Sequence, residues 1–419
     1  MIMIADLLIN KKIYAIKRSM RRLYPLILAG VILITFFVSL KGGFVYDDHF
    51  QLENNPYIKD FSHLKLLITK DVWYFSPETK SNNYRPVHML TYLFIYFVFG
   101  PNPLAYHAVN LMVHLIVVLL LYRVFLKYVE GLSAFLGALL FAVHPIHVES
   151  IAWIGGITDL LCAVFLLSSL LLFFNGKTYM SLIPFGFALW SKEIAVMFPA
   201  LILADQWLFR RNSKDQTRRW FIGAILLIAI YSGMRIFALG TIVRRNAVSN
   251  NFFAQAYSAV VFAGMYIQKL LAPIQLNAFY DFHIPHGVTD SVPAIILLLI
   301  FVMLGWILRR NRILIFGLLW FIIFLLPALV VSGVSPVLFA ERYLYLPSAG
   351  AALAAVSFRM RSRTMLLMFV LVIVYAIVSF NRSRIWHDDL ALWADTIQKS
   401  PGSATVNYNL ATAYMKTNR

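Results

Sequence analysis

The sequence predicts an all-α fold, a polytopic transmembrane helix bundle of about eleven spans. Of its 419 residues, 60% are hydrophobic and 13% are charged, and the mean hydropathy is +0.74. A soluble domain cannot bury so much apolar surface in one core. The formal net charge is +18, but the basic residues cluster between apolar runs. Membrane topology therefore explains the charge, and no nucleic-acid partner is expected.

Residues 1–23 form a basic stretch, which we interpret as a cytoplasmic N-terminus. The first apolar run, Tyr24–Leu40, is followed by no small-residue cleavage site, so it is typical of an uncleaved signal anchor. The predicted membrane domain is 24–380, with an outer loop at 41–103, and a separate C-terminal segment covers 381–419. The single cysteine excludes an intrachain disulfide.

Further apolar runs complete the predicted bundle. They are Leu104–Tyr122, Leu132–Ser150, Ile157–Asn175, Tyr179–Trp190, Ile194–Phe209, Trp220–Leu239, Val292–Leu308, Ile313–Val331, Tyr343–Phe358 and Thr364–Phe380. With this threading, the inner side holds 20 of the 37 basic residues and only four of the 19 acidic residues, as the positive-inside rule requires. Val87–Phe99 and Ala254–Leu271 would invert this pattern, so we expect interfacial or re-entrant helices there.

Polar residues of the outer side are the candidates for a functional site. Asp47 and Asp48 are adjacent, so their repulsion favours one of them as a proton acceptor, or a divalent cation shared by both; a solvated acidic pair explains the pattern equally well. Other ionisable residues stand at the outer ends of predicted spans, where such groups usually line a cavity. They are His144, His147, Glu149, Asp159, Lys192, Glu193, Glu341 and Arg342.

Ordinary hydrogen bonding accounts for each of these residues alone, and the spacing of His144, His147 and Glu149 does not favour a metal site. Their convergence from separate outer turns is what indicates an outward-facing cavity. Arg244 and Arg245 lie on an outer loop beside a predicted interfacial helix. This basic pair suits either a lipid phosphate or ordinary headgroup contact.

The order of the outer motifs resembles a known family. The matching segments are Tyr46-Asp47-Asp48, Tyr84-Arg85-Pro86, His107 with Asn110 and His114, His144-Pro145-x-His147-x-Glu149, Asp159-Leu160-Leu161, Ser191-Lys192-Glu193 and Glu341-Arg342-Tyr343-Leu344-Tyr345. In these residues the chain resembles the transmembrane and tetratricopeptide-repeat O-mannosyltransferases. More broadly, it resembles the GT-C glycosyltransferases that use polyprenyl-phosphate sugars.

The resemblance implies an active site on the luminal or periplasmic face, in the inner membrane if the source is bacterial. It also implies that Asp47 or Asp48 is the catalytic base of an inverting sugar transfer to a protein or glycan acceptor. The leaving polyprenyl phosphate needs cations, for which Arg342, Lys192, Arg85 and the pair Arg244 and Arg245 are candidates. Eukaryotic members tend to show Gly-Arg-x-Asp where this chain has Gly156-Ile157-Thr158-Asp159, so the resemblance does not fix the sugar.

The C-terminal segment resembles tetratricopeptide repeats in Leu392-Trp393-Ala394 with Pro401, and in Tyr408-Asn409-Leu410-Ala411. Because one and a half repeats cannot bury their apolar faces alone, we expect either a truncated array or a helix pair docked on the outer loops. Such repeats would bind a protein partner outside the membrane.

Three other classes of function remain open at this stage. A transporter or flippase would use the same outer residues as a vestibule, but internal repeats and midplane ionisable groups are not evident in the sequence. A polysaccharide polymerase or ligase would use outer arginines without the early acidic pair. A noncatalytic scaffold would tolerate replacement of Asp47 and Asp48.

Overall fold

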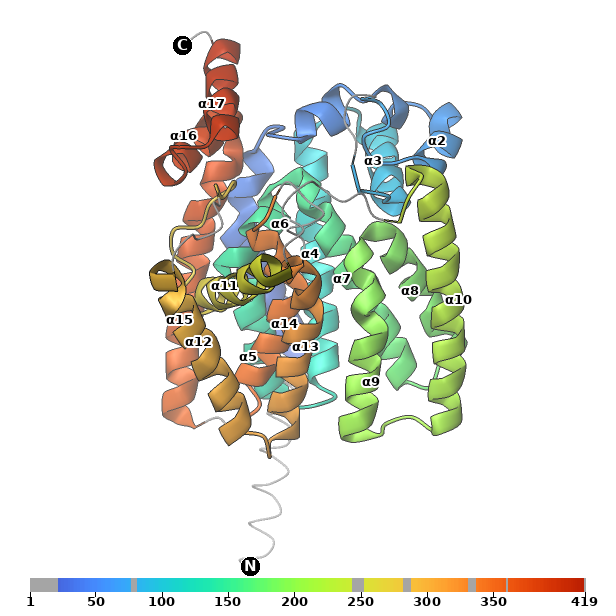
Figure 1. Cartoon of the computed structure of the whole chain (residues 1–419), viewed down its shortest axis with the longest axis vertical. Helices are drawn as coiled ribbons and strands as arrows, with labels where there is room; N and C mark the ends of the chain where they lie inside the picture. Colours follow the sequence, from blue (N-terminus) through green and yellow to red (C-terminus); the bar gives the residue numbers. More distant parts are fainter. Residues whose placement is uncertain are drawn as a thin grey trace, which may run out of the picture.

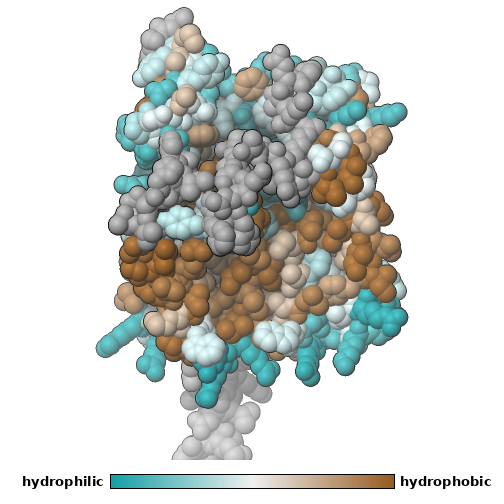
Figure 2. All heavy atoms as spheres, viewed as in Figure 1, coloured by the Kyte–Doolittle hydropathy of each residue, from teal (hydrophilic) through white to brown (hydrophobic). Residues whose placement is uncertain are grey.

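The computed structural model describes residues 22–76, 81–242, 252–281, 288–330, 337–358 and 361–417. These residues form helices joined by turns, with no strand among them. Figure 1 shows most of the helices side by side along the long axis, and Figure 2 shows an apolar band between two more polar ends. A bilayer covers such a band, because its core offers no water to polar groups. The chain is therefore an integral membrane protein.

Six helices in the described part of the chain are long and apolar enough to cross a membrane. They are Arg22–Lys41, α4 (Pro103–Phe125), Ile154–Phe174 with α7 (Ile157–Phe174), α10 (Lys214–Leu239), α13 (Arg312–Leu329) and Ser362–His387 with α15 (Ser362–Ser383). A seventh crossing arises if α5 (Gly131–Ala142) and the helical segment Pro145–Ala152, which includes α6 (Val148–Ala152), count as one span bent by 52°.

The remaining predicted spans fall on four other helices. They are α8 (Thr178–Ser191), α9 (Phe198–Phe209), α12 (Val288–Ile307) and α14 (Tyr345–Ala355). Three of these have 14, 12 and 11 residues, fewer than a bilayer normally requires, and α12 contributes a shorter apolar stretch at Ile295–Ile307. The predicted all-α membrane bundle is confirmed, while the count of about eleven spans stays a prediction.

Two apolar segments that we expected outside the membrane form α3 (Pro86–Phe99) and α11 (Phe252–Leu271). Neither belongs to the six long candidate spans. In Figure 1, α11 runs across the bundle rather than along it.

Close packing in the bundle depends on small residues. A methyl group on Gly317 of α13 would lie 2.6 Å from the carbonyl oxygen of Gly350 in α14, so only glycine lets these two helices approach so closely. α4 packs against both α5 and α7, and α7 packs against α8. These helices pack along one another and form much of the core of the bundle.

The C-terminal helices α16 (Asp389–Lys399) and α17 (Ala404–Lys416) pack against each other and bury Leu392, Trp393 and Val406. Figure 1 places them at the same end of the molecule as α3 and the short α2 (Leu64–Thr69), opposite the α9–α10 turn. A docked helix pair is thus present, and its assignment as a tetratricopeptide repeat stays a prediction.

Candidate functional site

The acid loop, residues 42–53, follows the first helix and carries both adjacent aspartates. Tyr46 has a φ of 56°, in the left-handed region that a non-glycine residue adopts only when its surroundings enforce it. Its backbone N–H donates to Asp389 Oδ1 at 2.9 Å, and its ring contacts Trp153 and Trp393. This local turn sets the directions of the next two side chains.

The two aspartates have different surroundings. Asp48 is 1% exposed, and its two carboxylate oxygens accept backbone N–H groups of Val45 at 3.2 Å and Gly155 at 3.1 Å. Asp47 is only partly buried, and its carboxylate makes no hydrogen bond or ion pair within the described part of the chain. Burial raises the pKa of Asp47 to about 6, with Arg342 acting in the opposite direction. Burial raises the pKa of Asp48 as well, so what distinguishes Asp47 as a proton acceptor is that its carboxylate oxygens have no hydrogen-bond partner among the described residues.

The backbone N–H of Gly155 reaches Asp48 because the buried side-chain amide of Asn110 fixes the turn that contains Gly155. Asn110 of α4 donates from Nδ2 to the carbonyl oxygens of Trp153 at 2.9 Å and Ile154 at 3.3 Å. At Gly156 an added methyl group would lie 2.5 Å from the carbonyl oxygen of Ser150, so the turn is compact. The packed helices therefore hold the acid loop in place through the hydrogen bond between Gly155 and Asp48.

Glu149 and Arg342 form an ion pair next to this loop. The carboxylate of Glu149, 2% exposed, accepts both a guanidinium N–H from Nη1 and, at 3.0 Å, the backbone N–H of Arg342. The guanidinium also lies over the rings of Trp153 and Tyr343, 5.4 and 5.3 Å from their centroids. Among the described residues the polar contacts of this side chain use Nη1 alone, so Nη2 and Nε can still donate to an anion.

Two further ion pairs lie near the pair that Glu149 and Arg342 form. Lys192 Nζ lies 2.6 Å from Asp159 Oδ1, with both side chains almost fully buried, and 5.6 Å from the centroid of the Tyr343 ring. Arg85 donates to Glu193 from Nε at 3.1 Å and from Nη2 at 2.6 Å, a bidentate pair. The outer cluster comprises Asp47, Asp48, Arg85, Glu149, Asp159, Lys192, Glu193 and Arg342.

The structure therefore brings together residues from separate turns at one end of the molecule, as the sequence indicated. Arg342 is electrostatically coupled to Asp159 as well as to Glu149, and Arg85 is coupled to Asp159 as well as to Glu193. Three of the five acids in the outer cluster are paired with one of its cations, and Asp48 accepts backbone N–H groups. Asp47 is the remaining acid, and Arg342 acts on it electrostatically.

Three other predicted residues have structural partners elsewhere. His144 Nε2 donates to the carbonyl oxygen of Leu270 at 2.9 Å, and His147 Nε2 lies 2.8 Å from the Ser348 hydroxyl. Glu341 accepts the Tyr280 hydroxyl at 2.6 Å and a backbone N–H, and burial raises its pKa to about 7. These contacts join helices, so ordinary hydrogen bonding explains all three.

Arg244 and Arg245 lie outside the described residues. In the part of the chain that the structure describes, no group of three or more His, Cys, Asp or Glu side chains has the arrangement of a metal site. Since both oxygens of Asp48 already accept backbone N–H groups, the two aspartates do not offer a matched pair of free carboxylates to a cation. A divalent metal at this pair stays an untested prediction.

Sequence reasoning missed three residues at this end of the molecule. Asp389 contacts the acid loop, and Trp153 lies under the Arg342 guanidinium. Arg235, 6% exposed and near the C-terminal end of the apolar helix α10, donates to the carbonyl oxygens of Asn82 at 2.7 Å and Ile242 at 2.8 Å. An arginine inside an apolar run is a signal that could have been used. Asp389 offered no such signal, because it belongs to an amphipathic helix.

Fold and site together define a helical membrane protein that has, at one end of its described part, buried ion pairs beside the unpaired carboxylate of Asp47. In comparisons of whole sequences, the chain is similar to proteins named protein O-mannosyl-transferases. F38B6.6 of Caenorhabditis elegans is 27% identical over 416 residues, covering 92% of this chain and 59% of that protein. TMTC1 of Homo sapiens is 41% identical over 151 residues, covering 34% and 17%, and TMTC4 of Homo sapiens is 34% identical over 163 residues, covering 35% and 22%.

These matches confirm the resemblance that the outer motifs indicated. The chain spans 59% of the length of the Caenorhabditis elegans protein and smaller shares of the two human ones. No protein-family model matches the chain, and no solved structure matches it.

Proposed function

We propose that this protein is an inverting GT-C-type glycosyltransferase of the membrane, which transfers a sugar from a polyprenyl-phosphate donor to a protein on the extracytoplasmic face. The observation that carries the proposal is the placement of the partly buried, unpaired Asp47 carboxylate in the field of Arg342. A base and a cation at one site are what sugar transfer from a phosphate requires. The names of the relatives favour a protein acceptor and mannose as the first sugar to test.

In the proposed reaction, an acceptor hydroxyl attacks the anomeric carbon of the donor while Asp47 takes the hydroxyl proton. The bond between the anomeric carbon and the phosphate oxygen breaks with its electron pair, and polyprenyl phosphate leaves. Arg342 would stabilise the negative charge that develops on this phosphate through Nη2 and Nε. A base on one side and a leaving group on the other give inversion at the anomeric carbon.

The other members of the outer cluster hold these two groups in place. Glu149 binds both the side chain and the backbone of Arg342, and Asp48 anchors the acid loop to Gly155. Arg85 is already bidentate on Glu193, and Lys192 is buried against Asp159, so both are less available to the donor phosphate than Arg342 is. A divalent cation would find one free carboxylate here, that of Asp47, and the proposed reaction does not depend on it.

The proposal is tested with the chain reconstituted in lipid nanodiscs and supplied with radiolabelled polyprenyl-phosphate mannose. Transfer of label to membrane protein and to water is followed separately. Arg342→Ala should lower turnover about tenfold or more, a loss on the order of 1.4 kcal/mol in transition-state stabilisation.

Arg211→Ala is the matched control. Arg211 also pairs with a buried acid, Asp205, at 3.1 Å, and lies 4.4 Å from the centroid of an aromatic ring, that of Tyr128. It follows α9 and precedes α10, at the end of the molecule away from the acid loop (Figure 1). If the two variants lost the same turnover per folded protein, Arg342 would have no role in donor chemistry.

A further inference from the structure

The acid loop is held from outside the membrane domain by one carboxylate. Asp389, the first residue of α16, accepts the backbone N–H of Tyr46 at 2.9 Å through Oδ1 and the Nε2 N–H of His49 at 2.8 Å through Oδ2. These two contacts lie on either side of Asp47 and Asp48 in the chain. The Asp389 side chain is 17% exposed, so water competes little for its oxygens.

The contact to Tyr46 acts on the residue whose backbone conformation is unfavourable. A tyrosine with a φ of 56° keeps that conformation only while neighbouring groups over-determine it. Its N–H is bound by Asp389, and its ring packs on Trp393 of α16 with the centroids 5.2 Å apart. Both restraints come from the C-terminal helix pair, and Asp47 is the next residue.

Within the loop, His49 extends the same restraint. Its other ring nitrogen, Nδ1, contacts Glu53, so the imidazole bridges two carboxylates. The hydrogen bond to Asp389 is the main reason that the pKa of His49 is raised, which strengthens this bridge at neutral pH. The nearest further charge on the C-terminal pair is Lys416, 3.5 Å from Asp389.

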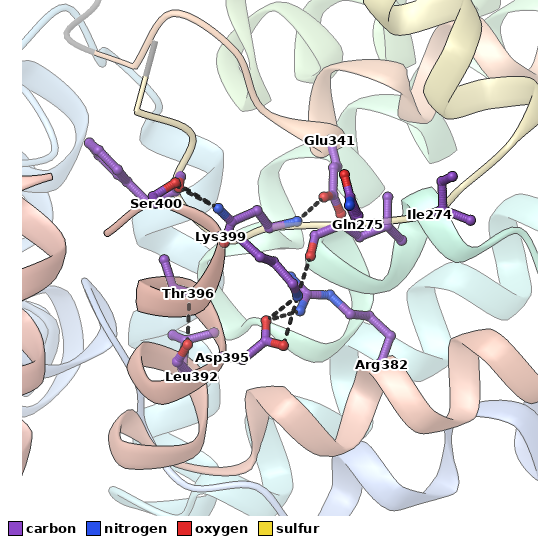
Figure 3. A network of polar contacts seen from close by, with 12 residues as sticks. Ile274, Gln275, Glu341, Arg382, Leu392, Asp395, Thr396, Lys399 and Ser400 are labelled. Atoms are coloured by element: carbon purple, nitrogen blue, oxygen red, sulfur yellow. Dashed lines mark hydrogen bonds and ion pairs between the residues drawn. The ribbon is translucent and has the colours of Figure 1, made fainter. Parts of the chain in front are cut away.

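The far end of α16 is held by a separate set of contacts. Asp395 pairs with Arg382 and with Lys399, each at 2.6 Å, and Lys399 also donates to the carbonyl oxygen of Leu276 at 2.8 Å (Figure 3). The backbone N–H of Asn277 then donates to Glu341, the residue before Arg342. Through these contacts, α16 is linked both to the acid loop, which carries Asp47, and to the segment that carries Arg342.

We infer that Asp389 is a positioning residue, through which the C-terminal helix pair holds the acid loop so that the Asp47 carboxylate faces the donor site. This inference rests on the proposed function and adds a role for the C-terminal segment. The helix pair is then a working part of the site, rather than only a surface for partners.

The test measures transfer from radiolabelled polyprenyl-phosphate mannose by the whole chain in nanodiscs. Asp389→Ala removes both contacts and should lower kcat about tenfold, with the KM for the donor changed much less, because the base moves while the phosphate contact stays. Asp389→Asn keeps an oxygen that can accept the Tyr46 N–H, so it should recover most of the lost kcat.

Asp388→Asn is the control, because Asp388 is exposed, caps the same helix and can be replaced by asparagine, which caps equally well. The second readout is the acidic limb of the pH–rate profile. In Asp389→Ala this limb should move to lower pH, since a loosened loop exposes the Asp47 carboxylate to water and removes the burial that raises its pKa.

A purely structural role for Asp389 would lower the amount of folded protein and leave the limb in place, and that result would overturn the inference. Wild-type kinetics of Asp389→Ala would overturn it as well. The proposed function is tested separately by Asp47→Asn: if that variant is inactive while Asp389→Ala is normal, only the present inference fails. If Asp47→Asn also transfers sugar at the parental rate, the proposed function fails.

Discussion

Replacing the two adjacent aspartates one at a time by asparagine should separate a reactive carboxylate from an anchoring one. Asparagine keeps the size of the side chain but cannot accept a proton. Asp47→Asn should lose roughly a hundredfold or more in transfer rate, the usual contribution of a general base. Its stability should be unchanged or higher, because burial raises the pKa of Asp47 and the ionised form therefore disfavours the folded state above about pH 6.

Asp48→Asn should behave differently. Both oxygens of Asp48 accept backbone N–H groups, from Val45 and Gly155, at a side chain that is 1% exposed. An amide has a single acceptor oxygen, so one of these N–H groups would face an NH₂ donor. Leaving one buried donor unsatisfied costs about 1–3 kcal/mol. We expect a clearly lower melting temperature.

The single cysteine provides the assay. Cys162 is fully buried in α7, so a dye that becomes fluorescent on reaction with thiols reports unfolding of the membrane domain in detergent. Rates are then expressed per folded molecule for each variant. If Asp48→Asn lost activity with unchanged melting while Asp47→Asn kept the parental rate, the roles assigned to the two residues would be reversed. Parental rates in both folded variants would favour the scaffold alternative.

Three further predictions concern pH, a buried ion pair and topology. Turnover should rise as the pH increases through about 6, since Asp47 accepts a proton only when ionised, and a flat profile between pH 5 and 8 would contradict this assignment. Lys192→Met should destabilise the fold by about 3–5 kcal/mol, because it leaves Asp159 charged and buried, and the additional change Asp159→Asn should restore much of the melting temperature. Reporter fusions at Lys214 and after Arg384 should lie on opposite sides of the membrane, as expected if the α9–α10 turn and α16 occupy opposite ends (Figure 1). Reporters on the same side of the membrane would contradict the predicted topology of eleven spans.

The sequence predicted the membrane bundle and named all eight residues of the outer cluster for a simple physical reason. Long apolar runs and the separation of charges report directly on a bilayer, and ionisable residues at the ends of such runs are too costly to occur without a role. Lys192, Asp159 and Glu149 were found in this way, and all three are buried in ion pairs.

The number of membrane spans and the pairing of polar side chains were harder to predict from the sequence. The helices α8 and α9 are shorter than a bilayer is thick, so hydropathy alone does not say whether each one crosses. Spacing along the chain likewise could not show that Arg85 pairs with Glu193, or that His144 binds the carbonyl oxygen of Leu270, since these partners are 108 and 126 residues apart. Long-range pairing depends on the packing of helices, which a single sequence does not specify.

The acidic pair shows the same limit at the scale of two residues. From sequence, the mutual repulsion of Asp47 and Asp48 suggested that one of them is a proton acceptor or that both share a cation, and the spacing excluded neither residue as the base. In the fold, the left-handed Tyr46 turns the chain so that Asp48 points to the backbone of Val45 and Gly155, while Asp47 stays unpaired near Arg342. An unpaired, partly buried carboxylate costs stability. Asp47 keeps this position because two other aspartates fix the loop that carries it: Asp48 binds Gly155, and Asp389 binds Tyr46. In the proposed function the two acids therefore have separate roles, Asp48 holding the loop and Asp47 acting as the base. This division follows from backbone geometry that the residue types do not encode.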